Sequence, residues 1–347
     1  MTAPYAAVAM QLTAQSVENC TDRAEARAQI FGMIEALEAK VRASAIFIEQ
    51  YGGLPVKLAV LPEYLFTSYP GRISIADFAD KACFAVNGPE YEALGALAQR
   101  LGMFIAGNAY EVDTHFPGLY FQASFVVAPS GNVVLRYRRL ISMFAPTPHD
   151  VWDKYLDVYG LDGVFPVAKT EIGNLAAIAS EEILYPEIAR ALAYRGAEIF
   201  VHSSSEIGSP LATPKAIARR ARAFENMAYV VSANTAGISD TALPLASADG
   251  NSQIVDYQGK IMAESNSGET FTAFGTIDLE AQRAARRRPA MTNVLARQAT
   301  ELFAASYGDT SIRVANGISG LESPPTRDYF VEAQRAAIAR LIEDGTI

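Results

Sequence analysis

The chain has 347 residues, half of them hydrophobic, enough to bury a substantial core in one large domain or two modest ones. Its formal net charge of −9 argues against nucleic acid or an anionic membrane as the principal partner. Two cysteines and three scattered histidines have neither the spacing of a disulfide framework nor that of a zinc site. Because the first residues carry no basic-then-apolar leader and no apolar run reaches about 18 residues, we expect a cytoplasmic chain that does not enter the membrane.

Apolar strands alternate with amphipathic helices along the chain, which indicates a layered α/β fold. Strands are expected over 6–12 and 56–61, on either side of a helix over 22–49 whose apolar residues recur at helical spacing. A helix over 91–101 precedes strands over 103–106, 120–128 and 133–137, with a turn at 129–132. Later strands are predicted over 172–179, 198–202, 229–233, 253–256 and 271–277, and helices over 187–195 and 214–227.

The chain divides into a catalytic-type domain over residues 1–290 and a tail over 291–347. The tail holds a Gly/Ser/Pro-rich stretch over 317–325, followed by an amphipathic helix over about 329–342. Its apolar stripe, which includes Phe330, Ala337 and Leu341, is expected to pack on another surface. That surface is either the tail's own domain or a second subunit, which the tail would grip as a dimer arm.

Four polar residues, Glu63, Glu111, Arg139 and Ser180, each follow an apolar strand segment. One charged residue after a strand usually marks only the start of a loop. Four of them, after strands expected to be neighbours, predict a site, because sheets of this class assemble their sites at strand ends.

The segments around these residues resemble the nitrilase superfamily, the carbon–nitrogen hydrolases, over roughly residues 5–290. Ile178-Ala179-Ser180-Glu181-Glu182, where a strand turns into a helix, resembles the family's nucleophile elbow. Leu61-Pro62-Glu63 resembles the segment that carries the general-base glutamate. Gly107 to Glu111 is similar to the segment with a second, supporting glutamate, and Tyr137-Arg138-Arg139 to the segment whose lysine follows Tyr-Arg.

The resemblance implies a four-layer α-β-β-α sandwich, no cofactor and no metal, a small-molecule substrate, and a homodimer or higher homo-oligomer that pairs sandwiches. It implies that Glu63 is the general base, Ser180 the nucleophile, Arg139 the group that stabilises developing negative charge, and Glu111 the positioner of Arg139. In this chemistry the nucleophile attacks an amide or nitrile carbon, a covalent intermediate forms, and water activated by the same glutamate releases the acid.

The chain departs from the family pattern at two of the three catalytic positions, with Ser180 for cysteine and Arg139 for lysine. A hydroxyl needs a stronger activating base than a thiol, and an arginine keeps its charge but cannot give up a proton. No histidine lies in a recognisable motif beside Ser180, which argues against a Ser-His-Asp arrangement. A laboratory Cys-to-Ser change would alter one position alone, so the simultaneous Arg139 favours natural divergence. A smaller departure is Gln122, where the family usually has asparagine.

The segment over 141–169 corresponds to the region that lines or covers the pocket mouth in the family. Phe144, Trp152 and Tyr155 would give it an apolar or aromatic wall, although a lone tryptophan is more often a packing residue. Glu182 and Tyr185, just after the nucleophile position, are the other candidate substrate-binding residues. Two functions stay open: a diverged hydrolase of small amides or nitriles, and a catalytically inactive relative that binds a small ligand or partner through the inherited pocket.

Overall fold

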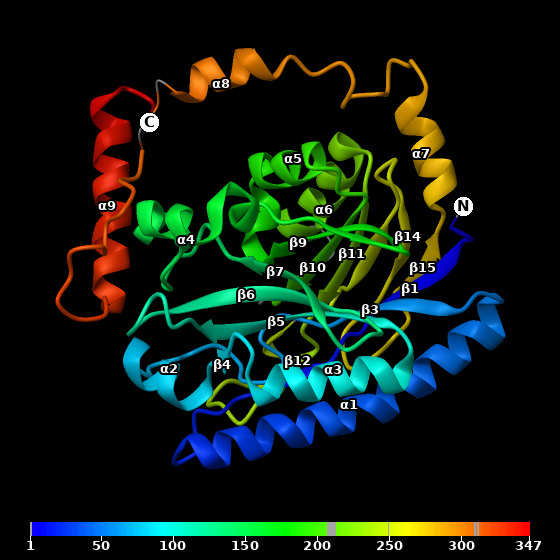
Figure 1. Cartoon of the computed structure of the whole chain (residues 1–347), viewed down its shortest axis with the longest axis horizontal. Helices are drawn as coiled ribbons and strands as arrows, with labels where there is room; N and C mark the ends of the chain where they lie inside the picture. Colours follow the sequence, from blue (N-terminus) through cyan, green and yellow to red (C-terminus); the bar gives the residue numbers. More distant parts are fainter. Residues whose placement is uncertain (1, 207–212, 249, 309, 311) are drawn as a thin grey trace.

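Two β-sheets pack face to face in the computed structural model, which describes residues 2–206, 213–248, 250–308, 310 and 312–347 (Figure 1). The first sheet has the order β15-β1-β3-β5-β6-β7, with β4 paired to β5. Its strands are β1 (Tyr5–Ala9), β3 (Val56–Val60), β4 (Phe84–Ala85), β5 (Phe104–Val112), β6 (Tyr120–Val127), β7 (Val133–Arg138) and β15 (Phe274–Ile277).

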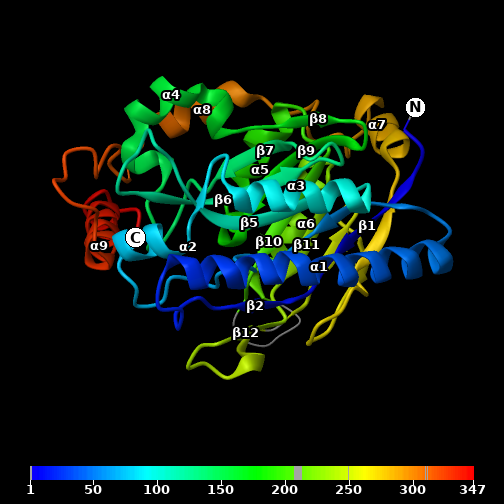
Figure 2. The same cartoon turned by 60° about the horizontal axis from the view of Figure 1, so that its bottom comes forward.

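The second sheet has the order β14-β13-β11-β10-β9-β8. Its strands are β8 (Ala168–Thr170), β9 (Gly173–Ala179), β10 (Ile199–Ser204), β11 (Tyr229–Asn234), β13 (Gln253–Val255) and β14 (Ile261–Glu264). Two further strands, β2 (Thr13–Gln15) and β12 (Gly237–Ser239), form a small parallel pair at the lower edge of Figure 2.

Helices cover the outer face of each sheet. The first sheet is covered by α1 (Arg23–Gly52) and α3 (Pro89–Leu101), and the second by α5 (Pro186–Tyr194) and α6 (Pro214–Asn226) (Figure 1). The short helix α2 (Ile75–Ala82) lies against α1 and β5. These layers confirm the predicted α-β-β-α sandwich. Among the described residues, no helix combines the length and the apolarity needed to cross a membrane.

Strand β1 shows why the central strands read as continuous apolar runs. Tyr5, Ala7 and Ala9 belong to the cluster between the two sheets, whereas Ala6 and Val8 belong to the cluster under α1. Successive side chains point to opposite faces of a strand, and both faces are covered here. An apolar residue is therefore favoured at every position, and no alternation appears in the sequence.

The first helix forms where its sequence predicts it. The Asp22 side chain accepts a hydrogen bond from the Glu25 N–H and caps the first turn, and Gly53, with φ of 71°, closes the last. The predicted stripe is buried; its members are Ile30, Ile34, Leu37, Val41 and Ile48.

Strand β5 is longer than predicted and corrects the placement of Glu111. The sequence predicts this strand only over 103–106, but its pairing with β6 runs from Ile105 opposite Val127 to Val112 opposite Tyr120. Glu111 therefore lies within the strand rather than after it. Glycine is required at 107 inside the strand because a Cβ there would come within 2.7 Å of the Phe125 ring.

The tail packs on its own domain. After α7 (Leu279–Arg287) the chain passes through α8 (Thr300–Gly308) to α9 (Arg327–Glu343), which lies at the side of the sandwich near α4 (Trp152–Val164) (Figure 1). The Asn316 N–H donates to the His149 carbonyl at 2.9 Å, and the Ile318 N–H to the Asp150 carbonyl at 3.1 Å. Phe330 is buried. The tail's role as a dimer arm stays a prediction.

Candidate active site

Ser180 lies at a sharp turn between β9 and the short helix η2 (Ser180–Leu184), which leads into α5. Its φ of 50° is in the left-handed region, which costs energy for any residue with a side chain. Two-sided burial fixes β9 up to Ala179, and Pro186 starts α5, so the turn between them has little freedom. The predicted nucleophile therefore lies at a strained strand-to-helix turn with only 5% of its surface exposed.

His202 on β10 holds the backbone of this turn. Its Nε2 lies 2.8 Å from the Ser180 carbonyl oxygen and its Nδ1 lies 2.8 Å from the Ser232 Oγ. A carbonyl only accepts, so Nε2 carries the hydrogen and Nδ1 accepts from the serine. Burial, together with the nearby Arg219 and Lys215 charges, holds the pKa of His202 well below its usual range. This neutral ring reaches the backbone of Ser180 rather than its hydroxyl, so it positions the turn.

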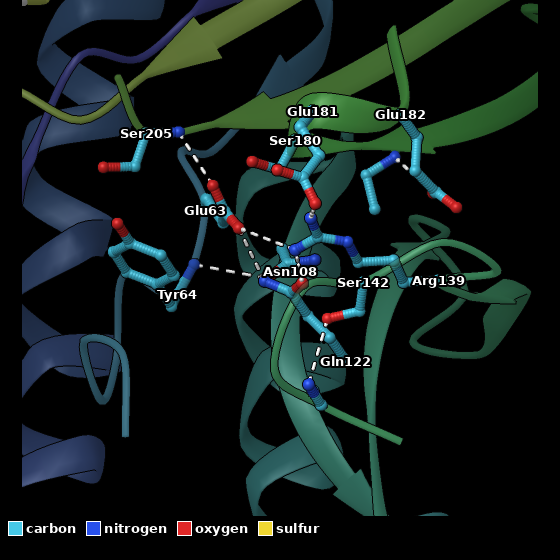
Figure 3. Close-up of polar contacts among 12 residues, drawn as sticks. Glu63, Tyr64, Asn108, Gln122, Arg139, Ser142, Ser180, Glu181, Glu182 and Ser205 are labelled. Atoms are coloured by element: carbon cyan, nitrogen blue, oxygen red, sulfur yellow. Dashed lines mark hydrogen bonds and ion pairs between the residues drawn. The ribbon is translucent and has the colours of Figure 1, made fainter. Parts of the chain in front are cut away.

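Glu63 follows β3 and lies in a buried polar group that Figure 3 shows together with Ser180 and Arg139. Its Oε1 accepts from the Gln122 Nε2 at 2.7 Å, and its Oε2 accepts from the Ser205 N–H at 2.9 Å. The Arg139 Nη1 is 3.7 Å from Oε1. The structure thus brings three of the predicted site residues, Glu63, Arg139 and Ser180, to one place.

The Arg139 guanidinium bridges two acids. Its Nη2 pairs with Glu181, its Nη1 donates to the Gln122 Oε1 at 2.6 Å, and its Nε donates to the Ile141 carbonyl at 2.7 Å. Burial opposes the charge, but Glu181 and Glu63 hold the pKa of Arg139 above its usual value. Gln122 joins the pair, because its amide donates to Glu63 and accepts from Arg139. Its departure from asparagine was visible in the sequence, but this bridging role was not predicted.

Lys215 is a site residue that the sequence analysis missed. Its Nζ lies 3.2 Å from the Ser180 Oγ, 3.2 Å from the Ser204 Oγ and 2.8 Å from the Ser205 carbonyl oxygen. It lies in the first turn of α6, whose N-cap is Thr213. The available signal was a lysine at the start of the predicted helix over 214–227, after a strand that ends in serines.

Glu182 has a structural position, contrary to its predicted contact with substrate. Its carboxylate accepts from the Leu140 N–H at 2.7 Å, the Ile141 N–H at 3.0 Å and the Tyr137 hydroxyl at 2.8 Å, and its side chain is fully buried. Burial raises the pKa of Glu182 to about 7, against the opposing effects of Arg139 and these donors. Glu182 therefore ties η2 to the segment after β7 and does not face an open pocket.

Glu111 also differs from its predicted role. Its Oε1 accepts from the Arg138 Nη2 at 2.8 Å, and its Oε2 accepts from the Arg136 Nε at 2.5 Å and the Tyr91 hydroxyl at 3.0 Å. Side chains alternate along β7, so Arg136 and Arg138 reach Glu111 while Arg139, one residue on, turns to Glu63. Glu111 is thus a partner of the two strand arginines and not the positioner of Arg139.

The predicted aromatic wall is only partly brought to the site. Tyr155 is buried in an apolar cluster with Phe116 and Phe121, and Trp152 packs against the same cluster. The Phe144 ring lies beneath the Arg327 guanidinium of the tail, 3.9 Å from it. Tyr185 directly follows η2 and is 38% exposed. Burial and the Glu181 charge raise the pKa of its hydroxyl. Tyr185 keeps its candidate role, whereas the structure gives Trp152 and Tyr155 packing roles.

The described residues include no group of three His, Cys, Asp or Glu side chains that could hold a metal ion. The chemistry available to the site from its own side chains is acid, base and nucleophile chemistry. Around the Ser180 hydroxyl the site holds the buried Glu63 carboxylate and two basic side chains, Arg139 and Lys215.

The sequence matches the carbon-nitrogen hydrolase family model over residues 8–287. The chain belongs to this family. Among carbon–nitrogen hydrolases, it is 22% identical over 230 residues to a probable nitrilase of Schizosaccharomyces pombe, which covers 66% of this chain and 78% of that one. It is 26% identical over 231 residues to an (R)-stereoselective amidase of a Pseudomonas species, covering 66% of this chain and 76% of the amidase.

Solved carbon–nitrogen hydrolases share the fold. The structure of Saccharomyces cerevisiae Nit3, a member of branch 10 of the nitrilase superfamily, superposes with a TM-score of 0.61 at 19% identity. The superposition covers 83% of this chain and 95% of Nit3. The family assignment gives the chain an activity class, hydrolysis of carbon–nitrogen bonds other than peptide bonds.

Proposed function

We propose that this protein hydrolyses a small amide, or a nitrile, through an ester formed on Ser180. One observation carries the proposal: Ser180 occupies a strained turn, with its hydroxyl in the same buried polar group as the Glu63–Arg139 pair. Strain of this kind persists where the surrounding structure over-determines it, and it clusters at active sites. The amidase and nitrilase relatives support the substrate class.

In this proposal the Ser180 oxygen bonds to the amide carbon, the hydroxyl proton is passed on to the departing nitrogen as the C–N bond breaks, and the amine leaves an ester of Ser180 behind. Water then attacks the ester carbon, Glu63 takes a proton from that water, and the proton returns to the Ser180 oxygen as the acid leaves. Glu63 suits this step because Gln122 and the Ser205 N–H fix its orientation. The Arg139 charge stabilises the negative oxygen of both tetrahedral intermediates.

The test is ammonia or amine release from a panel of small amides and nitriles, with intact-mass detection of an acyl adduct. We expect the wild type to turn over and Ser180→Ala to lose roughly 10³-fold or more of the rate, since the nucleophile is removed. A double variant, Ser180→Cys with Arg139→Lys, restores the family's usual residue types and serves as the positive comparison. If neither the wild type nor the double variant shows turnover or an adduct, the hydrolase proposal fails.

A second candidate function is an inactive relative that binds a small ligand through the same site. The ion pair between Arg139 and Glu181 favours it, because it reduces the positive charge left for a reacting oxygen. This candidate predicts that the double variant is active while the wild type is not. Turnover by the wild type would exclude it.

A further inference from the structure

Ser180 needs a stronger base than the family's usual cysteine does. A thiol is partly ionised near neutral pH, whereas a hydroxyl requires a strong base at hydrogen-bond distance. Among the described residues, Glu63 is hydrogen-bonded to Gln122 and to the Ser205 N–H and not to the Ser180 hydroxyl. The titratable group in contact with the Ser180 Oγ is Lys215, whose Nζ is 3.2 Å away.

We propose that Lys215, rather than Glu63, takes the proton from the Ser180 hydroxyl, so that an amine activates this serine for attack on a small amide. The inference rests on the proposed function and adds a catalytic residue that the family's residue pattern lacks. Serine–lysine pairs are a known alternative to the serine–histidine arrangement. Here the lysine comes from α6 and the serine from the turn after β9.

The three contacts of the Lys215 nitrogen fit both protonation states that a base must pass through. As a neutral amine it can donate two hydrogens, to the Ser205 carbonyl and the Ser204 Oγ, and accept the Ser180 hydroxyl hydrogen with its lone pair. As an ammonium it donates to the same three oxygens. Gaining the proton therefore requires no rearrangement of the side chain. Ser204 is a positioning residue in this arrangement.

The surroundings of Lys215 favour the neutral amine more than water does. Burial lowers the pKa of Lys215 below the lysine value of 10.5, and the Arg219 and Arg139 charges act in the same direction, while Glu63 and Glu206 oppose them. The lysine also lies in the first turn of a 13-residue helix, where the helix dipole disfavours a positive charge. A lysine base must be deprotonated to act, and this position helps it to be so.

The proposed acylation step balances without any further reactant. As the Ser180 oxygen bonds to the amide carbon, its proton passes to the Lys215 amine and the C=O electron pair moves onto the amide oxygen. When the tetrahedral centre collapses, that pair re-forms the C=O bond and the C–N bond breaks. The departing nitrogen then takes the proton from the Lys215 ammonium, which returns the amine to its starting state.

The experiment measures acetylation of residue 180 in the full chain by p-nitrophenyl acetate, localised by mass spectrometry, with Ser180→Ala as the blank. Loss of a general base costs typically 10²–10⁴-fold, so we expect Lys215→Met to acetylate at least about 100-fold more slowly. Lys215→Arg keeps the charge but cannot deprotonate, and it should be equally slow. Lys169→Met, at an exposed lysine on β8, is the matched control and should acetylate at the wild-type rate.

The pH profile separates a base from a residue that only supports the fold. We expect the wild-type acetylation rate to rise with pH through an apparent pKa below the ordinary lysine value, and the rise to be absent in Lys215→Arg. Glu63→Gln removes a charge that raises the pKa of Lys215, so it should move the profile to lower pH. The Glu63→Gln variant should also slow hydrolysis of the acetyl ester more than it slows acetylation of Ser180.

A cysteine background gives a second readout in case Lys215→Met is poorly folded. In the Ser180→Cys background the thiol ionises with less help. Replacing Lys215 should therefore slow acetylation by a factor at least about tenfold smaller than it does with Ser180. An equal cost in both backgrounds would overturn the proposal, as would wild-type acetylation in Lys215→Met. Amide turnover that persists in Lys215→Met leaves the hydrolase function standing and removes only the lysine base. If the wild type neither acetylates nor turns over an amide, both proposals fail.

Discussion

The Ser180 backbone carries a conformational cost that a glycine would not. At its φ of 50° a residue with a Cβ is disfavoured by roughly 1–2 kcal/mol. The His202 hydrogen bond to its carbonyl and the burial of Ala179 hold this conformation in place. In this conformation the Ser180 Oγ lies 3.2 Å from the Lys215 Nζ, a contact that a glycine would lack.

We therefore expect Ser180→Gly to be more stable than Ser180→Ala. Both variants lose the hydroxyl contact with Lys215, so the comparison isolates the backbone. Glycine avoids the left-handed penalty but loses roughly 0.5–1 kcal/mol through its freer unfolded chain, which leaves a net gain of about 0 to 1.5 kcal/mol. Urea unfolding of the two variants measures the difference. An alanine variant more stable than the glycine variant would show that the turn is not strained.

Sequence reasoning located the residues of this site that lie at strand ends and missed those that reach it across the fold. Glu63, Arg139 and Ser180 each follow a predicted strand, but these strands are not neighbours: β5 and β6 separate β3 from β7, and β9 lies in the second sheet. Their convergence was implied by the family resemblance. Lys215 lies 35 residues beyond Ser180, and its contact depends on how α6 packs beside the end of β10. Neither periodicity nor motif spacing encodes that side-chain contact.

At the scale of elements, the turn after β9 is fastened from both sides by buried titratable groups. His202 on β10 holds the Ser180 carbonyl, and Glu182 on η2 accepts from the backbone after β7. Each group is held in its neutral form more strongly than in water, the histidine by burial and nearby cations, the glutamate by burial. Because one group is an acid and the other a base, their contributions to the free energy of unfolding change with pH in opposite directions.

We expect these two groups to give stability slopes of opposite sign. Below pH 6.5 the unfolded chain binds a proton at His202 that the folded chain does not, so its contribution to the free energy of unfolding falls by about 1.4 kcal/mol per pH unit as the pH drops. Glu182, with a folded pKa of about 7 against 4.5, is protonated in the folded chain first. Its contribution therefore rises as the pH falls from 7 to 4.5.

Urea unfolding of His202→Gln and Glu182→Gln across pH 4.5 to 7 tests these signs. The glutamine at 202 can still donate to the Ser180 carbonyl and accept from Ser232, and relative to wild type this variant should gain stability as the pH falls. The Glu182→Gln variant should lose stability relative to wild type over the same range. If the free energies of unfolding of the two variants, relative to wild type, changed with pH in the same direction, one of the two groups would not be neutral in the folded chain.

The bounds of a helix or strand were predictable where the same pattern of apolar residues ran along its whole length. The helix α1 and its buried stripe follow from spacing alone, and so do the hairpin strands β6 and β7. The strand predicted over 103–106 covers only the first part of β5. Its continuation depends on pairing with β6 and on the Phe125 ring against Gly107, which are tertiary facts.

At the scale of the molecule, the sandwich was implied by the family resemblance, whereas the docking of the tail required the structure. Ile318 is buried in a cluster with Phe116, Val151 and Tyr155 of the domain. Arg313 pairs with Asp150 in the same region, at 3.4 Å. The tail thus covers the segment that the sequence analysis had assigned to the pocket mouth, which explains why Trp152 and Tyr155 are packed rather than open.

Shortening one buried tail side chain should loosen the tail without unfolding the sandwich. Removing a buried isoleucine down to alanine costs about 2–5 kcal/mol, and because the tail lies outside both sheets, we expect the loss to appear as local opening. Ile318→Ala should therefore speed tryptic cleavage after Arg327 and Arg335 by at least about tenfold. Ile338→Ala, on α9 but 43% exposed, is the matched control and should be cleaved at the wild-type rate.

The same pair of variants also separates the two expectations for the tail. Ile318 contacts the chain's own domain, so loosening it should leave the molar mass from light scattering unchanged if the tail serves only that domain. If the tail instead grips a second subunit, the cleavage-prone Ile318→Ala variant should fall in mass as well. Equal tryptic resistance of Ile318→Ala and Ile338→Ala would contradict the docking seen here, because only the first removes a buried contact.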